Sequence, residues 1–508
     1  MDGKATTETG HKQALSVSQL VELVCELTGA VGELRQSVAD LEQTVRVQQQ
    51  TIGELQVENA RLKGQLEDRD GQHPTQRLDD EYSLEAEDKR SGKRPKKQKS
   101  DRRGRRTTAE KLALAHRHED VYPKDVSPDD CTLHLSRVVW RVENGQTVLV
   151  GYHVYRRPGG EVPKIPGTLG RSEYGIEITV ALTYMVFVMR QSMDKVCEQL
   201  EFFWGLKLAK SQADALLNQL AREWEPEFDR LCTLLANSAV VHADETGWSI
   251  NSVWAFLSEQ VRIIMFGVHK DGATLATLLP KELFDGVLVS DDAAVYRGFT
   301  LAQKCWAHLI RKAIRLTLLQ PNNMKYRTFL TGLLTLYRKA GRVKQDRRLK
   351  PSTRERKALA LENDLWALCG SRFKDHTPPA TDAEHDFIKL VNELMRLMET
   401  SELFTFVTHP DVPGTNNEAE RALRDAAKDR KTGRTSQTIR GARRRTVLTS
   451  VLESLRLSLP TFTLRHVLEE VNDWMITGRS RFRQLLESLN LPPPKRSPLD
   501  ALLPATGV

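Results

Sequence analysis

The chain has 508 residues, 40% of them hydrophobic and 28% charged, which predicts several domains with hydrophobic cores. The first residues lack the apolar stretch of a secretion signal, and the chain has no run of about 18 apolar residues that could cross a membrane. The six cysteines are scattered along the chain. We therefore expect a cytoplasmic protein with no disulfides and no membrane contact. The net charge of +8 comes from one basic segment, which favours a polyanionic partner.

Residues 15–70 show a heptad repeat. Leucine recurs at one seam position, including Leu27, Leu34 and Leu41, and valine or isoleucine recurs at the other. Such a pattern favours a parallel two-stranded coiled coil, in which one polar residue at the seam, here Asn59, fixes the register. The alternative is a single amphipathic helix packed on its own domain. The length of the repeat favours the coiled coil and therefore a homodimer.

Residues 71–125 are expected to form a basic disordered linker. Within it, residues 89–106 contain 11 Lys or Arg and one acid, a net charge of +10, so the rest of the chain sums to −2. We interpret this run as an arm that binds a polyanion; the alternative is a solvated linker with no partner. The residues assigned to the arm are Lys93, Arg94, Lys96, Lys97, Arg102, Arg103, Arg105 and Arg106.

Residues 126–165 are predicted to form a small β-rich module. Two segments rich in strand-forming residues flank the turn at 143–145, which predicts a hairpin. Cys131 and His134 have a spacing seen in zinc sites, and His153 lies near them in the sequence. Three ligands do not complete a four-coordinate structural site, so we expect no structural zinc.

The remaining chain alternates between helical and mixed patterns. A helical domain is expected first, and then the order strand, strand, strand, helix, strand, which is the opening of a ribonuclease H-like fold. We therefore expect an α/β ribonuclease H-like domain with a helical insertion, mostly α flanking regions and a C-terminal tail that is disordered at 492–508. The expected parts are the helical domain 166–236, the first part of the core 237–320, the insertion 321–408, the second part of the core 409–475 and the tail 476–508.

Two aspartates are candidate metal ligands. Asp244 follows the apolar run 239–241, and Asp291 follows the run 287–289, so each is predicted to stand at the end of a strand. Neighbouring strands bring such carboxylates to one point, and Mg²⁺ prefers carboxylate oxygens and water as ligands. The alternative is that both are ordinary turn formers.

A third carboxylate comes from a helix predicted to begin near residue 415. Thr415 and Glu418 fit a capping box, which gives Glu418 a structural role. Glu420 lies on a different face of that helix, where Arg424, four residues later, can orient it. Glu420 is therefore the better candidate for the third ligand, and the spacing alone leaves Glu418 as the alternative.

Residues 421–445 follow this helix start and contain ten Lys or Arg and two acids. Beside a metal site, such a segment suits a surface that binds phosphates; the alternative is an exposed helix face without a partner. The residues assigned to this surface are Arg424, Arg430, Lys431, Arg434, Arg443 and Arg444.

At four strings, the chain resembles the transposases of insertion-sequence family sixty-six, the TnpC-like proteins. They are H-A-D-E-T-G-W (242–248), G-V-L-V-S-D-D-A-A-V-Y (286–296), Q-K-C-W-A-H-L-I-R (303–311) and G-T-N-N-E-A-E-R-A-L-R (414–424). Their order and content match the family over about residues 165–475.

The resemblance implies a ribonuclease H-like catalytic domain with an Asp-Asp-Glu triad of Asp244, Asp291 and Glu420. Cys305-x-x-His308 resembles a signature that recurs after the second aspartate in several such transposases. His308 would then contact the scissile phosphate or support the site, while a buried core histidine is the alternative. The chain departs from the family where many members carry two Cys-x-x-Cys pairs, a zinc-binding module, before the catalytic domain. Here only Cys131 and His134 stand at that place, so the resemblance implies that the module at 126–165 is a degenerate zinc-binding one.

The resemblance further implies a DNA transposase that cleaves phosphodiesters at transposon ends and transfers the strands into target DNA. Two Mg²⁺ or Mn²⁺ ions would serve both steps. The implied partners are double-stranded DNA at the transposon ends and target, and accessory transposition proteins; the location would be the bacterial cytoplasm, associated with the nucleoid. Two alternatives stay open: a ribonuclease H-like nuclease that cuts without joining, and a non-catalytic DNA-binding regulator.

Overall fold

The structure is a computed structural model that describes residues 106–374, 378–492 and 497–504, together with five single positions between 32 and 50, which are helical. The heptad seam, including Leu27, Leu34, Leu41 and Asn59, lies outside the described residues. So does the basic arm, except for the exposed Arg106. Residues 106–508 form one structural unit, which contains all the numbered helices and strands.

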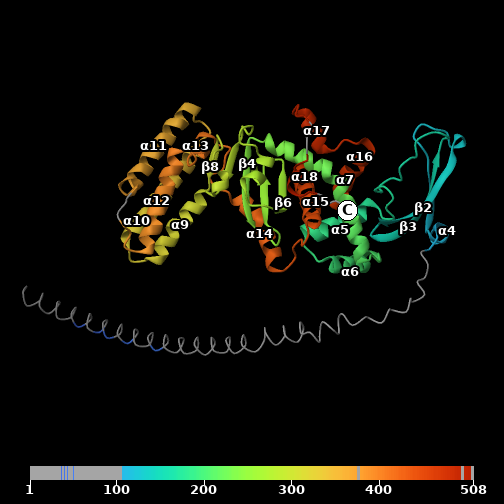
Figure 1. The fold of residues 1–508 in the computed structure, drawn as a ribbon, viewed down its shortest axis with the longest axis horizontal. Helices are drawn as coiled ribbons and strands as arrows, with labels where there is room; N and C mark the ends of the chain where they lie inside the picture. Colours follow the sequence, from blue (N-terminus) through green and yellow to red (C-terminus); the bar gives the residue numbers. More distant parts are fainter. Residues whose placement is uncertain are drawn as a thin grey trace, which may run out of the picture. The chain divides into compact units, whose positions relative to one another are not determined.

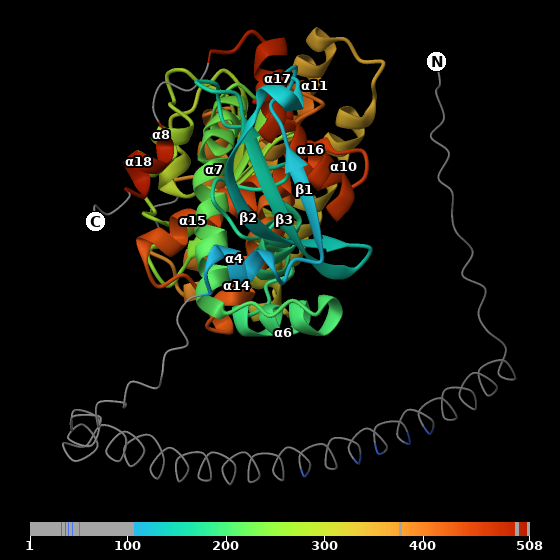
Figure 2. The same cartoon turned by 90° about the vertical axis from the view of Figure 1, so that its right-hand side faces the viewer.

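The N-terminal part of this unit is a three-stranded sheet (Figure 2). It contains α4 (Thr108–Leu112), β1 (Arg117–Val121), η1 (Pro128–Asp130), β2 (Thr132–Glu143) and β3 (Gln146–Arg156). β3 pairs with β1 in parallel and with β2 in antiparallel fashion. The predicted hairpin is confirmed, since Asn144 and Gly145 both adopt positive φ angles, 50° and 77°, as a tight two-residue turn requires.

The linker assigned to 71–125 is wrong at its C-terminal end. α4 begins at a capping box formed by Thr107 and Glu110, and β1 completes the sheet. The ordered module therefore begins near residue 107 instead of 126. The sequence does not predict β1, because R-H-E-D-V has no alternation of apolar and polar residues. This segment is a strand through its parallel pairing with β3.

A helical segment follows, as the periodicity predicts. It comprises α5 (Ile176–Thr183), the π-helix η2 (Tyr184–Val188), α6 (Met193–Trp204) and α7 (Lys210–Ala236). The buried face of α7 includes Leu217, Leu220 and Leu231, which join the main hydrophobic core. This segment packs α7 against α15, a later helix of the chain.

The central element is a five-stranded sheet of order β6-β5-β4-β7-β8. Its members, with the helices among them, are β4 (Val240–Gly247), β5 (Ser252–Leu257), β6 (Arg262–Val268), α8 (Gly272–Leu278), β7 (Val287–Ser290), η3 (Ala294–Tyr296) and β8 (Ala302–Lys304). β4, β5 and β6 are antiparallel neighbours, while β7 and β8 run parallel to β4. The predicted order of three strands, a helix and a strand is confirmed; three-residue β8 is too short to show a sequence pattern.

Two helices cover the sheet near β6 and β4. They are α14 (Asn417–Lys431), which packs on β4 and β5, and α15 (Ile439–Ser458), which packs on β6. Thr446, Ser450 and Ser454 of α15, spaced four residues apart, accept hydrogen bonds from backbone N–H groups of β6. These hydroxyls satisfy the edge of the sheet, which otherwise would offer unpaired groups to another strand.

On the other side of the sheet, next to β8, lies a bundle of helices with its own core (Figure 1). It comprises α9 (Trp306–Leu319), α10 (Met324–Gln345), α11 (Pro351–Cys369), η4 (Gly370–Arg372), α12 (Asp382–Glu399) and α13 (Thr405–Thr408). Buried Arg354 donates to backbone carbonyls at the C-terminal end of α10 and to that of Val407, which joins α10, α11 and α13. The stretch assigned to an insertion is thus helical.

The expectation that residues 492–508 are disordered is wrong at 498–502, which form a helix. After α16 (Leu464–Thr477), the chain forms α17 (Arg481–Ser488) and α18 (Pro498–Leu502). Phe482, Leu486 and Leu499 are buried in the main core. These apolar side chains are few and widely spaced, so the Pro-rich composition around them hid their packing. No helix among the described residues has the length and apolar character to span a membrane.

Candidate active site

Asp244 and Asp291 lie at the same edge of the central sheet. β4 and β7 are parallel, and their last paired residues are His242 and Val289. Each aspartate stands two residues further along its chain, so the two are level with each other. The prediction that Asp244 stands at the end of its strand is wrong, because β4 continues to Gly247. Beyond His242, β4 pairs with β5 and no longer with β7. The carboxylates therefore stand where β7 separates from β4.

The helix that carries Glu420 is fixed beside Asp244 by Asn416. Asn416 is fully buried, its Nδ2 donates to the carbonyl of Ala243 at 2.8 Å, and its Oδ1 lies 3.0 Å from Nδ1 of His242. Burial lowers the pKa of His242, so its neutral ring donates to this oxygen. Asn416, preceding α14, holds the first turn of the helix against β4.

The predicted capping box is wrong as a consequence. The residue that caps α14 is Asn416 instead of Thr415, and its side chain bonds β4 instead of the helix's own first turn. Glu418 therefore has no capping role; it lines a separate cavity of about 400 Å³. Glu420 lies on the other side of the helix, among the catalytic candidates.

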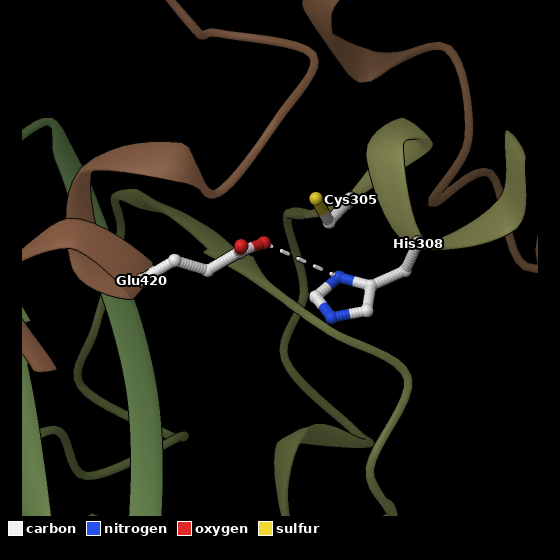
Figure 3. A group of neighbouring side chains, drawn as sticks. All are labelled: Cys305, His308 and Glu420. Carbon is white, nitrogen blue, oxygen red and sulfur yellow. Dashed lines mark ion pairs between the residues drawn. The ribbon is translucent and has the colours of Figure 1, made fainter. Parts of the chain in front are cut away.

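Glu420 faces α9. Nη2 of Arg311 donates to both carboxylate oxygens of Glu420, at 2.8 and 3.1 Å, and Nδ1 of His308 lies 3.6 Å from one of them (Figure 3). Arg424, the predicted partner, is exposed. Sequence reasoning missed Arg311 because it precedes Glu420 by 109 positions, although it ends the third family-like string.

The electrostatics of this group are unusual. Burial, together with three nearby carboxylates, raises the pKa of Asp244 to about 7. They belong to Glu245, Asp291 and Glu420. Like charges around one partly buried point disfavour ionisation, and a cation placed there would reverse the effect. The group therefore has the character of a cation site.

Glu245 is held apart from this centre. Its carboxylate forms an ion pair with Lys270 at 2.6 Å and accepts a hydrogen bond from the hydroxyl of Tyr296. Behind Asp291, the buried ammonium of Lys304 donates to Ser290 at 3.1 Å. Burial lowers the pKa of Lys304. Asp291 and Glu420 are the remaining carboxylates whose charges raise the pKa of Asp244. Among the described residues, these three carboxyl groups do not gather within 4.8 Å of one another.

A cavity of about 520 Å³ opens beside the aspartates, between the end of β7 and helices α9 and α12. Asp291, Cys305 and His308 line it. His308 is thus placed at the predicted site, partly exposed. Asp292 also lines the cavity but is paired with Arg396 of α12.

The predicted phosphate-binding surface is only partly available. Arg424, Arg430, Lys431 and Arg434 are all exposed, but Arg430 and Arg434 already donate to the backbone carbonyls of Gly247 and Arg190. Of these four side chains, Arg424 and Lys431 are therefore the ones best placed to meet a phosphate.

Arg443 and Arg444, also assigned to this surface, do not face solvent. Arg443 pairs with Glu225 and Asp500, Arg444 pairs with Asp214, and their side chains are only 12% and 16% exposed. Their role is to tie α15 to α7 and to the C-terminal residues. The sequence pattern of α15 did not reveal this, because the helix is covered on most sides.

The sequence analysis assigned no DNA-binding role to α10, which is a basic helix. α10 carries six Lys or Arg and no acid. Near its C-terminal end, Arg338, Arg342 and Lys344 line a groove with Gly414, and no acidic side chain among the described residues lines it. Tyr337, also in this groove, packs on Trp306, which directly follows Cys305. The groove is therefore close to the start of α9 and to the loop before α14.

The residues of the degenerate zinc module are arranged differently from a metal site. His153 stacks on His118 and lies 2.8 Å from the hydroxyl of Ser136. Among the described residues, one group of three His, Cys, Asp or Glu side chains has its ligand atoms within 4.8 Å of one another. This group does not include Cys131 or His134.

Residues 171–444, which contain the central sheet and the acidic group, match a family model of transposases. Transposases are the enzymes that move DNA segments. The match covers more than half of the chain and includes Asp244, Asp291 and Glu420. The chain belongs to the transposase IS66 family, which confirms the resemblance seen in the sequence. Among curated proteins compared with the chain, none matches it.

Proposed function

We propose that the protein cleaves DNA at transposon ends and joins the freed strands to target DNA, with Asp244, Asp291 and Glu420 holding two divalent cations, Mg²⁺ or Mn²⁺. We also propose that the central sheet, α14 and α15 form a ribonuclease H-like core. The observation that carries this proposal is the placement of three carboxylates on neighbouring elements. The β4–β7 register sets Asp244 level with Asp291, and Asn416 fixes the start of α14 on β4, so that the charges of Asp291 and Glu420 raise the pKa of Asp244.

The residues suit the cations in their chemistry. Carboxylate oxygens are preferred ligands of Mg²⁺ and Mn²⁺. The mutual repulsion that raises the pKa of Asp244 is the property that a divalent cation would relieve. When bound, such ions activate a nucleophile and stabilise the leaving oxygen of a phosphodiester.

The protein's own side chains prepare the site. Arg311 orients Glu420 through two hydrogen bonds, and Asn416 fixes the distance between α14 and β4. His308, on the wall of the cavity, is placed to donate to a phosphate oxygen of DNA bound there. Rigid placement of this kind lowers the entropic cost of bringing the reacting groups together.

Two reactions follow at one place. In the first, the oxygen of water attacks phosphorus at the transposon end, the bond to the 3′ oxygen breaks, and a 3′-hydroxyl is released. In the second, that hydroxyl attacks a phosphorus of target DNA and displaces another 3′ oxygen, which leaves with a proton. Both are in-line displacements, so the same group of residues can serve both.

We propose that DNA contacts the exposed basic side chains around this site. Arg424 and Lys431 of α14 and the groove of Arg338 and Arg342 on α10 offer phosphate contacts, which position DNA without reading its sequence. The arm at 89–106, including Lys93 to Arg106, is proposed to add non-specific affinity.

We further propose a homodimer through residues 15–70, which would pair two transposon ends. Leu34→Glu together with Leu41→Glu places charges in the seam, and the chain is then expected to be monomeric by light scattering. The same double substitution should leave the thermal unfolding of residues 106–508 unchanged. A dimer that persists in the variant contradicts the proposal.

A strand-transfer assay tests the function. Oligonucleotides that carry the element's end and a 3′-hydroxyl are incubated with a target plasmid and Mg²⁺, and joined products are expected. Asp244→Asn, Asp291→Asn and Glu420→Gln should each abolish joining, while Glu418→Gln serves as the matched control on the same helix. Cleavage without joining would identify a nuclease, and DNA binding with no metal-dependent reaction would identify a regulator.

A further inference from the structure

A second group of ligands lies beside the proposed triad. The sulfur of Cys305, a ring nitrogen of His308 and a carboxylate oxygen of Glu420 all lie within 4.8 Å of one another. Cys305 precedes α9 and His308 lies in its first turn, and Glu420 approaches from α14, so all three side chains point toward one place (Figure 3). The three groups are of different chemical types, unlike the three carboxylates of the triad.

The histidine in this group lacks a hydrogen-bond partner. Nδ1 of His308 is buried and forms no hydrogen bond with any described residue, since its 3.6 Å separation from the Glu420 oxygen is too long for one. Buried polar atoms are satisfied in nearly all proteins, and an unsatisfied one calls for a ligand. Nδ1 is therefore an available donor of a lone pair.

The cysteine is prepared in a similar way. Its sulfur is buried and accepts the backbone N–H of Asn416 at 3.1 Å. Hydrogen bonds from backbone N–H groups to sulfur orient and stabilise cysteine ligands of metals. Asn416 is the residue that also bonds β4, so the position of the sulfur is tied to the same framework as Asp244.

The distances and ligand types favour one class of ion. Bonds of 2.0–2.3 Å in a tetrahedral zinc site separate the ligand atoms by about 3.3–3.8 Å, and the His308–Glu420 separation of 3.6 Å falls in this range. Sulfur and imidazole ligands favour Zn²⁺ and similar transition metals, whereas Mg²⁺ prefers oxygen. Three protein ligands would leave one position open.

We propose that Cys305, His308 and Glu420 form a site for a thiophilic divalent ion such as Zn²⁺. The ion reaches the group through the cavity that Cys305 and His308 line. The binding site itself does not require transposase activity, but its consequence rests on the proposed function. Glu420 belongs to both groups, so Zn²⁺ withdraws it from Asp244 and Asp291 and inhibits the Mg²⁺-dependent reaction.

Co²⁺, a coloured substitute for Zn²⁺, tests the site independently of activity. Titration of the tag-free, full-length chain is expected to give sulfur-to-cobalt charge-transfer absorption with one equivalent bound, and Zn²⁺ should remove it. Cys305→Ser should abolish this band, and His308→Ala should weaken Co²⁺ binding about tenfold or more.

The chain offers a matched control. Cys131 and His134 have the same spacing as Cys305 and His308, so Cys131→Ser should leave the band unchanged. Loss of the band in Cys131→Ser, its survival in Cys305→Ser, or its absence from the wild-type protein overturns the proposed site. Thermal unfolding of each variant, compared without metal, distinguishes loss of a ligand from loss of the fold.

The consequence has its own measurement. In the strand-transfer assay at fixed Mg²⁺, micromolar Zn²⁺ is expected to inhibit the wild-type protein, with half-inhibition shifted about tenfold upward in Cys305→Ser. If Co²⁺ and Zn²⁺ bind but inhibition is the same in both proteins, the sharing of Glu420 is wrong while the site stands. If no joining occurs in any protein, the transposase proposal fails and the cobalt result still decides the site.

Discussion

Replacing Asp244 with asparagine should stabilise the metal-free protein. In the fold, burial and nearby carboxylates raise the pKa of Asp244 from 3.8 to about 7. The difference is about three pKa units, and at 1.36 kcal/mol for each unit it amounts to about 4 kcal/mol of destabilisation when the group is ionised. Asparagine keeps the shape and the acceptor oxygen for the N–H of Glu245 but carries no charge.

The sign of the pH dependence follows from which state binds the proton. Below about pH 4, Asp244 is protonated in the folded and the unfolded protein and costs nothing. Between the unfolded pKa of 3.8 and the folded pKa of about 7, the folded state holds the proton more tightly, so stability falls as the pH rises. The advantage of asparagine is therefore largest at pH 8 and shrinks toward pH 5.

Thermal unfolding in the presence of a chelator measures the effect. At pH 8, an unfolding temperature higher by several degrees is expected for Asp244→Asn, since 1 kcal/mol corresponds to about 1 °C in a unit the size of Arg106–Val508. Asp473→Asn, which removes an exposed carboxylate, serves as the control. Added Mg²⁺ should stabilise the wild-type protein and not the variant. An Asp244→Asn protein that is no more stable than wild type at pH 8 refutes the crowding of charges.

Three further predictions concern arginines. Arg311→Ala removes two charged hydrogen bonds from the proposed metal-binding glutamate, so single-turnover cleavage should slow about tenfold or more. Arg465→Ala, which removes an exposed ion pair on α16, should change it less than about twofold, and equal effects contradict the geometry. Arg445→Ala leaves a buried carboxylate without its cation and should lower the free energy of unfolding by about 3–5 kcal/mol in urea titrations. Arg338→Gln combined with Arg342→Gln should reduce the slope of DNA affinity against salt concentration, on logarithmic axes, by about two; an unchanged slope in fluorescence anisotropy removes the α10 groove from the DNA surface.

Local patterns account for the parts of the fold that the sequence predicted. The hairpin at 143–145 and the order of the first four strands of the central sheet depend on short-range alternation and turn chemistry, which neighbouring residues impose on one another. The same signals are weak in β1 and β8, and they are interrupted in the C-terminal helices, where tertiary contacts decide the structure.

The three carboxylates show the same division. The sequence by itself supplied the three candidate cation ligands and, through the four family-like strings, the family to which the chain belongs. The placement of these carboxylates on neighbouring elements depends on the parallel register of β4 and β7 and on Asn416, whose bonds to β4 bridge more than 170 positions of the chain. Only the tertiary structure decided that Arg311 holds Glu420 and that Arg443 and Arg444 support the fold. A long-range partner leaves no periodic trace in the sequence, because its position depends on how whole elements pack.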